Sequence, residues 1–126
     1  MSRVCILVAD DFAPWRLRAR ELLHGRPEWH LEEARDGHEA VQKSAELLPD
    51  VVLLDIGMPV LNGIDAAKKI RRAAPGSAII FVTESAHEDL KAAVLALGAQ
   101  GYLSKANAAT ELLPAIESVL RNGHQG

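Results

Sequence analysis

Five polar side chains follow apolar runs of the sequence, and together they have the chemistry of a phosphoryl-accepting site. Asp10 and Asp11 follow the run at 4–9, and Asp55 follows the run at 51–54. Thr83 ends a run that starts at 78, and Lys105 comes shortly after a run at 102–103. Carboxylates that lie close together repel, and hard oxygen ligands favour Mg²⁺ (or Mn²⁺) as the counter-charge. With a cation, a lysine and a hydroxyl nearby, an aspartate can act as the nucleophile of a phosphoryl transfer.

The elements that must position these residues follow from the hydrophobic pattern. Five short apolar runs alternate with segments of helical periodicity, and we predict strands at 4–9, 30–34, 51–54, 78–82 and 102–103. Continuous Val/Ile/Leu runs are typical of strands covered on both faces by helices, whereas the polar run at 30–34 indicates a sheet edge. The alternation predicts an α/β fold of five βα units in three layers, with a parallel sheet. Because ligands bind at the carboxyl ends of such strands, the five polar side chains should converge.

Composition limits the alternatives. The 126 residues fit one domain, with a net charge of −3, 4% aromatic residues and one cysteine. Few aromatic rings and no basic excess argue against nucleic-acid binding by this chain. A single cysteine excludes a disulfide framework, and no apolar run approaches the ~20 residues of a membrane span. We therefore expect a cytoplasmic chain with no membrane partner.

The sequence resembles the receiver domains of two-component response regulators, the CheY-like family. The resemblance spans residues 3 to about 121 and rests on several motifs in order. They are VADD at 8–11, LLDIGMP at 53–59, NG at 62–63, FVT at 81–83 and GAQGYLSK at 98–105. The second and last motifs are most similar to the NarL/FixJ (LuxR-type) group of transcription regulators. The resemblance implies the flavodoxin-like fold with strand order 2-1-3-4-5.

The resemblance also implies a metal site and a phosphoacceptor. Asp55 would accept the phosphoryl group. Asp11, Asp55 and the carbonyl of Gly57 would hold Mg²⁺ (or Mn²⁺), and Asp10 would act mainly through a water. The chain would then be a phosphoacceptor switch that catalyses its own phosphorylation and loses the group slowly, rather than an enzyme that turns over substrates.

The same resemblance implies the switch and its partners. Thr83 and Lys105 would bind the phosphoryl oxygens, and Thr83 with Tyr102 would form the switch pair. A new charge of about −1.5 to −2 would bias a two-state element and reshape the surface of the fourth helix, fifth strand and fifth helix. A histidine kinase or phosphotransfer protein would donate the phosphoryl group. A homodimer, or control of transcription through an attached or partner DNA-binding domain, would be the output.

Three features depart from the resemblance. Ala106 follows Lys105, where other receiver groups commonly have a proline, and this fits the NarL-like group. Glu84 follows Thr83, where the family has a small or apolar residue, and its carboxylate could repel donors or shorten the phosphoryl lifetime; we predict unequal half-lives for wild type and Glu84→Ala. The chain also stops soon after the receiver pattern. We expect a receiver domain at 3–121 and a tail at 122–126 that would begin a linker to an output domain.

The residues leave one alternative function open, a receiver-like interaction module that works without phosphorylation. A flavin or dehalogenase-type enzyme on this fold is disfavoured, since no glycine-rich phosphate loop and no Asp-x-Asp pattern follow the first strand. Asp10-Asp11 could instead cap the first helix. Arg16, Arg18 and Arg20 are expected to form a solvated surface, and Pro114 predicts a fifth helix that starts late or bends.

Overall fold

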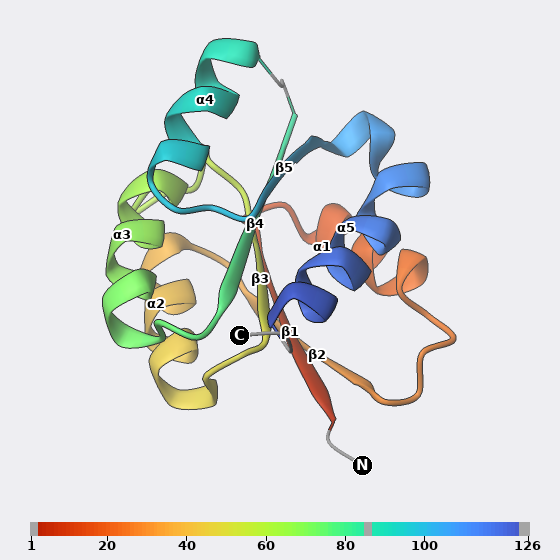
Figure 1. Ribbon diagram of the computed structural model, residues 1–126. Coiled ribbons are helices and arrows are strands. Elements are labelled where there is room, and N and C mark those ends of the chain that lie inside the picture. The colour runs from red at the N-terminus through yellow and green to blue at the C-terminus, as the bar shows by residue number, and fades with distance from the viewer. Residues whose placement is uncertain (1–2, 85–86, 124–126) are drawn as a thin grey trace.

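The computed structural model describes residues 3–84 and 87–123, and these form five βα units (Figure 1). The strands are β1 (Val4–Ala9), β2 (Trp29–Ala34), β3 (Val51–Leu54), β4 (Ala78–Thr83) and β5 (Gly101–Ser104). The helices are α1 (Ala13–Leu22), α2 (Gly37–Leu47), α3 (Gly63–Ala73), α4 (Glu88–Ala96) and α5 (Ala108–Gly123), with a 3₁₀ turn at Lys105–Asn107 before α5. No helix within the described ranges is long and apolar enough to cross a membrane.

All strands are parallel and run in the order β2-β1-β3-β4-β5, which confirms the predicted fold class and topology. The register pairs Ala9 of β1 with Leu54 of β3, and Leu54 with Phe81 of β4. These three residues end or nearly end their strands. The polar residues that follow β1 and β3 therefore emerge side by side at one edge of the sheet.

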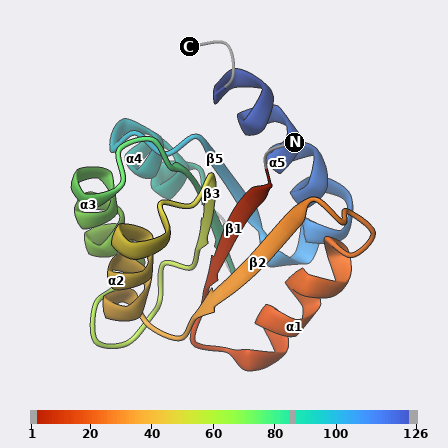
Figure 2. The ribbon, with the colours of Figure 1, turned by 90° about the horizontal axis from the view of Figure 1, so that it is seen from below.

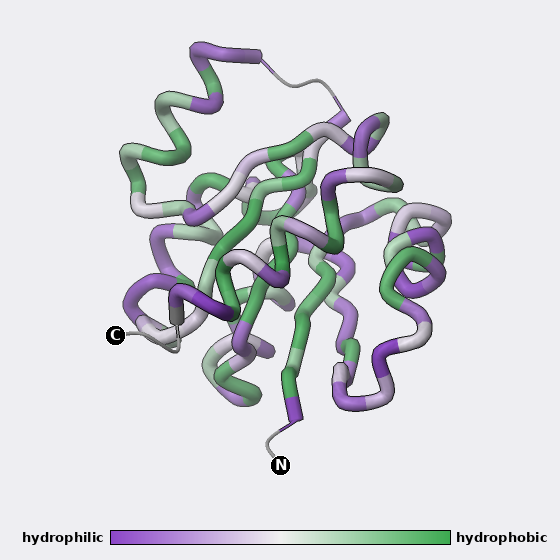
Figure 3. Tube along the Cα trace, turned by 45° about the vertical axis from the view of Figure 1, so that its right-hand side comes forward, coloured by the Kyte–Doolittle hydropathy of each residue, from purple (hydrophilic) through white to green (hydrophobic). Residues whose placement is uncertain are grey.

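Helices cover both faces of the sheet, as Figure 2 shows: α1 and α5 lie on one side and α2, α3 and α4 on the other. Ile6 and Val8 of β1 pack with Trp15 of α1 and Ile116 of α5 in one core. Alternate strand residues face a second core against the other three helices. The strands are apolar along most of their length while the helices carry hydrophilic segments (Figure 3), as expected for strands buried on both faces.

Local signals account for the helix starts at α2 and α3. The Asp36 carboxylate accepts a hydrogen bond from the amide of Glu39 at 2.8 Å. Likewise, the Asn62 side chain accepts one from the amide of Asp65 at 2.9 Å. These caps satisfy amides that have no partner inside their helices. Asp36 and Asn62 thereby determine where α2 and α3 begin after the carboxyl ends of β2 and β3.

Two alternatives that the sequence left open for the helices are decided by the structure. The residue that precedes α1 as its cap is Phe12, without a side-chain hydrogen bond, so the aspartate pair does not cap this helix. Helix α5 begins at Ala108 and contains Pro114, so it does not start late. Proline there removes one backbone donor, a loss that the buried Leu112 and Ile116 on the same helix offset by packing. α5 extends to Gly123, and residues 124–126 of the expected tail lie outside the described residues.

Candidate functional site

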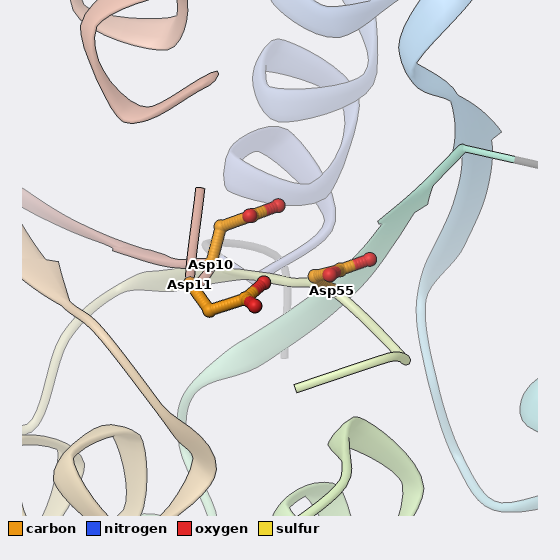
Figure 4. A group of neighbouring side chains, drawn as sticks. All are labelled: Asp10, Asp11 and Asp55. Carbon is orange, nitrogen blue, oxygen red and sulfur yellow. The ribbon is translucent and has the colours of Figure 1, made fainter. Parts of the chain in front are cut away.

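The acidic cluster forms where β1 and β3 end. Figure 4 shows the carboxylates of Asp10 and Asp11 from the end of β1 beside that of Asp55 from the end of β3. One oxygen from each lies within 4.8 Å of the other two. Asp10 is 1% exposed and Asp55 8% exposed, whereas Asp11 is exposed. Two strand ends thus present three acidic groups at one point, as the sequence predicts.

Backbone hydrogen bonds hold this cluster in place. The amide of Asp55 donates to the carbonyl of Ala9 at 3.0 Å, and the amide of Asp10 donates to the carbonyl of Ala34 at 3.0 Å. The Asp10 carboxylate also accepts from the amide of Phe12 at 2.8 Å. Asp10 and Asp55 are therefore positioned by the parallel ladder of the sheet.

Lys105 supplies the nearest positive charge. Its ammonium lies 2.7 Å from an Asp10 carboxylate oxygen and 3.7 Å from a Glu84 carboxylate oxygen. The ammonium also lies 5.4 Å from the centre of the buried Trp15 ring, within cation–π range. The lysine side chain is only 10% exposed. Among the described residues, no ion pair joins Lys105 to Asp55.

Asp55 is poorly suited to carry a charge in the absence of a cation. Burial, and secondarily the charge of Asp10, raise the pKa of the Asp55 carboxyl above its usual range. The charge of Lys105 and a hydrogen bond from the backbone of Ile56 oppose this rise only in part. Three oxygen donors with excess negative charge in a partly buried position suit a hard divalent cation. The residues present therefore fit Mg²⁺.

A hollow of about 350 Å³ opens beside the cluster, and its lining includes most of the predicted site. Asp11, Asp55, Gly57, Thr83 and Lys105 all line it, with Phe12 and Glu84. A methyl group added at Gly57 would meet no atom within 4 Å, so this backbone is open to a ligand. The structure thus brings together residues from four strand ends that lie far apart in the sequence.

Tyr102 lies apart from this hollow. Its partly buried ring packs against the α2–α3–α4 core, and its hydroxyl accepts a hydrogen bond from the amide of His87 at 3.2 Å, directly before α4. Thr83 pairs with Ser104 in the β4–β5 register, two positions beyond Tyr102. Tyr102 therefore connects β5 to the start of α4 on the side of the sheet that includes Thr83.

The loop after β3 is held close to the site by a glycine. The amide of Gly63 donates to the carbonyl of Ile56 at 2.8 Å. A Cβ at position 63 would lie 2.0 Å from the carbonyl oxygen of Asp55. In the same loop, Val60 has φ of 69° and is 81% exposed. A β-branched residue in the left-handed region is strained, and such strain is concentrated near functional sites.

Arg16 is a site residue that the sequence reasoning missed. Expected in a solvated surface, its side chain is only 13% exposed. Its guanidinium donates to the backbone carbonyl of Asp10 at 2.7 Å and to the Glu33 carboxylate at 2.7 Å. The prediction for Arg16 was wrong because the alternation of three arginines along α1 does not show which one faces β2. A contact between α1 and the strand-end carbonyl is a tertiary feature.

Comparison with known proteins gives a consistent result. A family model described as the response regulator receiver domain matches residues 6–117. The chain is 37% identical over 119 residues to the transcriptional regulatory protein LnrK of Bacillus subtilis, covering 94% of this chain and 54% of LnrK. It is 32% identical over 114 residues to the chemotaxis protein CheY of Thermotoga maritima, covering 90% of this chain and 95% of CheY. The crystal structure of the response regulator domain of Thermotoga maritima CheB superposes with a TM-score of 0.86 at 32% identity, covering 94% of this chain and 97% of that domain. The chain thus spans about half the length of LnrK.

Proposed function

The chain belongs to the response regulator receiver domain family, and from this premise we propose that it is the phosphoacceptor of a two-component system, modified on Asp55. The observation that supports the proposal is the cluster of three carboxylates beside a hollow that is lined by Asp55, a lysine and a threonine. Receiver domains of this family act as signalling switches rather than as enzymes, and many relatives are transcription regulators.

The proposed reaction is a phosphoryl transfer from a phosphohistidine of a kinase or phosphotransfer protein. A carboxylate oxygen of Asp55 forms a new bond to phosphorus. The bond between phosphorus and the imidazole nitrogen breaks, and its electron pair stays on that nitrogen. Asp55 is the candidate nucleophile because it alone of the three aspartates follows the central strand, β3, which lies between β1 and β4. The hydrogen bond from its backbone amide to the Ala9 carbonyl holds the residue at this position.

The neighbours of Asp55 would bind the group that arrives. Asp11, Asp55 and the Gly57 carbonyl would hold Mg²⁺ (or Mn²⁺), with Asp10 acting mainly through a water, and the ion would supply positive charge against the phosphoryl oxygens. The Lys105 ammonium, now beside Asp10, would bind one phosphoryl oxygen. The Thr83 hydroxyl, on a residue 8% exposed at the end of β4, would donate a hydrogen bond to another.

The switch would pass from Thr83 to Tyr102. Movement of the threonine hydroxyl toward the phosphoryl group would leave space on the α4 side of β4, into which the Tyr102 ring could turn. The hydrogen bond from the His87 amide to the Tyr102 hydroxyl, at 3.2 Å, would then break. The surface formed by α4, β5 and α5 would change, and this surface would control self-association or an effector, including a DNA-binding domain.

The proposal is tested by intact-mass measurement after incubation with acetyl phosphate and Mg²⁺. Wild type should gain one phosphoryl group, Asp55→Ala none, and Glu46→Gln should behave like wild type, because Glu46 lies near the end of α2, at the opposite edge of the sheet. An adduct on Asp55→Ala equal to that of wild type would refute the assignment. No adduct on any folded protein, together with no beryllofluoride binding, would favour an interaction module that works without phosphorylation. Size exclusion of the same samples reports self-association.

A further inference from the structure

Glu84 stands at the entrance of the proposed site. It follows the last residue of β4, and its side chain is 76% exposed. It lines the hollow that contains Asp55, and it also lines a second groove of about 380 Å³ formed with Pro14, Trp15 and Arg18. Glu84, Lys105 and Phe12 are shared by the two depressions and form the wall between them. A donor that enters the hollow to reach Asp55 therefore meets the carboxylate of Glu84 among the residues that line it.

The charge of Glu84 is in excess of what the site can neutralise. Three aspartates are balanced by one divalent cation and one lysine, which leaves no net charge at the site. Glu84 then adds one uncompensated negative charge at the entrance. Its carboxylate lies 3.7 Å from the Lys105 ammonium, whose shorter contact, at 2.7 Å, is with Asp10, so Lys105 does not neutralise Glu84 alone. The remaining negative charge opposes the approach of an anion.

We propose that Glu84 is a specificity-determining residue that disfavours small anionic phosphodonors at Asp55. The inference rests on the proposed function of Asp55. A free anion brings no positive charge to the entrance, so the full repulsion of Glu84 acts on it. Since an exposed ion pair contributes little to folding, the charge of Glu84 is explained better by an effect on donors than by stability.

The test measures the rate of adduct formation by intact mass at saturating Mg²⁺ and fixed ionic strength. Two donors are compared: acetyl phosphate, a dianion at neutral pH, and phosphoramidate, which carries a smaller net negative charge. Glu84→Gln keeps the shape and removes the charge, Glu84→Asp keeps the charge, and Glu46→Gln matches the change in net charge far from the site.

Glu84→Gln should react with acetyl phosphate about 3- to 10-fold faster than wild type, as expected for one charge acting on a dianion near the Debye distance. The gain should be smaller with phosphoramidate and should shrink as ionic strength rises. Glu84→Asp and Glu46→Gln should react at close to the wild-type rate. Equal rates for Glu84→Gln and wild type, or equal gains with both donors, would overturn the inference. Absence of any adduct on both wild type and Glu84→Gln with either donor, together with no beryllofluoride binding, would instead refute the proposed function.

Discussion

Removal of the Asp55 charge should stabilise the protein when no cation is bound. The three carboxylate oxygens lie within 4.8 Å of one another. At this separation and an effective dielectric constant of about 20, one pair of carboxylates repels by about 3.5 kcal/mol. Lys105 offsets part of this repulsion, and water screens the exposed Asp11. We therefore expect Asp55→Asn to be more stable than wild type by about 1–3 kcal/mol in EDTA.

The assay is urea unfolding, followed by Trp15 and Trp29 fluorescence, with EDTA or with Mg²⁺. Mg²⁺ at one hundred times its Kd should stabilise wild type by about 2.7 kcal/mol. Asp55→Asn should gain much less, because one of the three acidic ligands is lost. Glu46→Gln should show the wild-type response to Mg²⁺. An Asp55→Asn protein that unfolds at the same or a lower urea concentration than wild type in EDTA would refute the reasoning.

The raised pKa of Asp55 determines how the stabilities of wild type and Asp55→Asn depend on pH. Between the unfolded value of 3.8 and the higher folded value, the native state binds more protons than the unfolded state. The stability of wild type in EDTA therefore falls as pH rises through this interval, whereas Asp55→Asn lacks this contribution. The advantage of the variant should thus be small in acid and fully developed above the folded pKa. A constant difference across pH would contradict the assignment of the effect to the Asp55 charge.

Three further predictions concern the surroundings of the site. Gly63→Ala should destabilise by about 2–3 kcal/mol and weaken Mg²⁺ binding, since its Cβ would lie 2.0 Å from the Asp55 carbonyl oxygen; a urea midpoint and Mg²⁺ affinity equal to wild type would contradict this. Hydrogen bonding to Arg20 lowers the pKa of Glu33 despite partial burial, so the folded form keeps its charge to lower pH. Glu33→Gln should therefore be less stable than wild type at neutral pH, and this difference in stability should disappear as pH falls from 4.5 through the folded pKa. Thermal unfolding of both proteins at neutral pH and below the folded pKa tests this, and a difference that persists in acid would contradict it. Val60→Gly should stabilise by about 0.5–1 kcal/mol, because it relieves a left-handed conformation at a cost in glycine entropy and loses no packing; a lower urea midpoint than wild type would count against strain at this position.

The sheet edge at β2 illustrates a feature that sequence indicates only in part. The polar composition of the run at 30–34 predicts an edge strand, and the topology confirms it. The structure adds which side chains contact this edge strand. Arg20 donates to the carbonyl of Leu31 at 3.4 Å, and Lys43 donates to the carbonyl of Glu33. Cationic side chains on exposed strand carbonyls oppose pairing with another chain. Which cations reach the edge depends on how α1 and α2 pack.

The sequence by itself determined the strands, their order through the family resemblance, and the set of acidic, hydroxyl and lysine residues at the strand ends. This was possible because buried parallel strands require continuous apolar runs, and because parallel strands bring their carboxyl ends to one edge. Only the tertiary structure decided that Lys105 lies on Asp10 and Glu84, above the Trp15 ring, rather than on Asp55. It also showed that Arg16 holds the Asp10 carbonyl. Such contacts join residues from different elements, and they depend on helix packing and side-chain reach, which no periodicity in the sequence records.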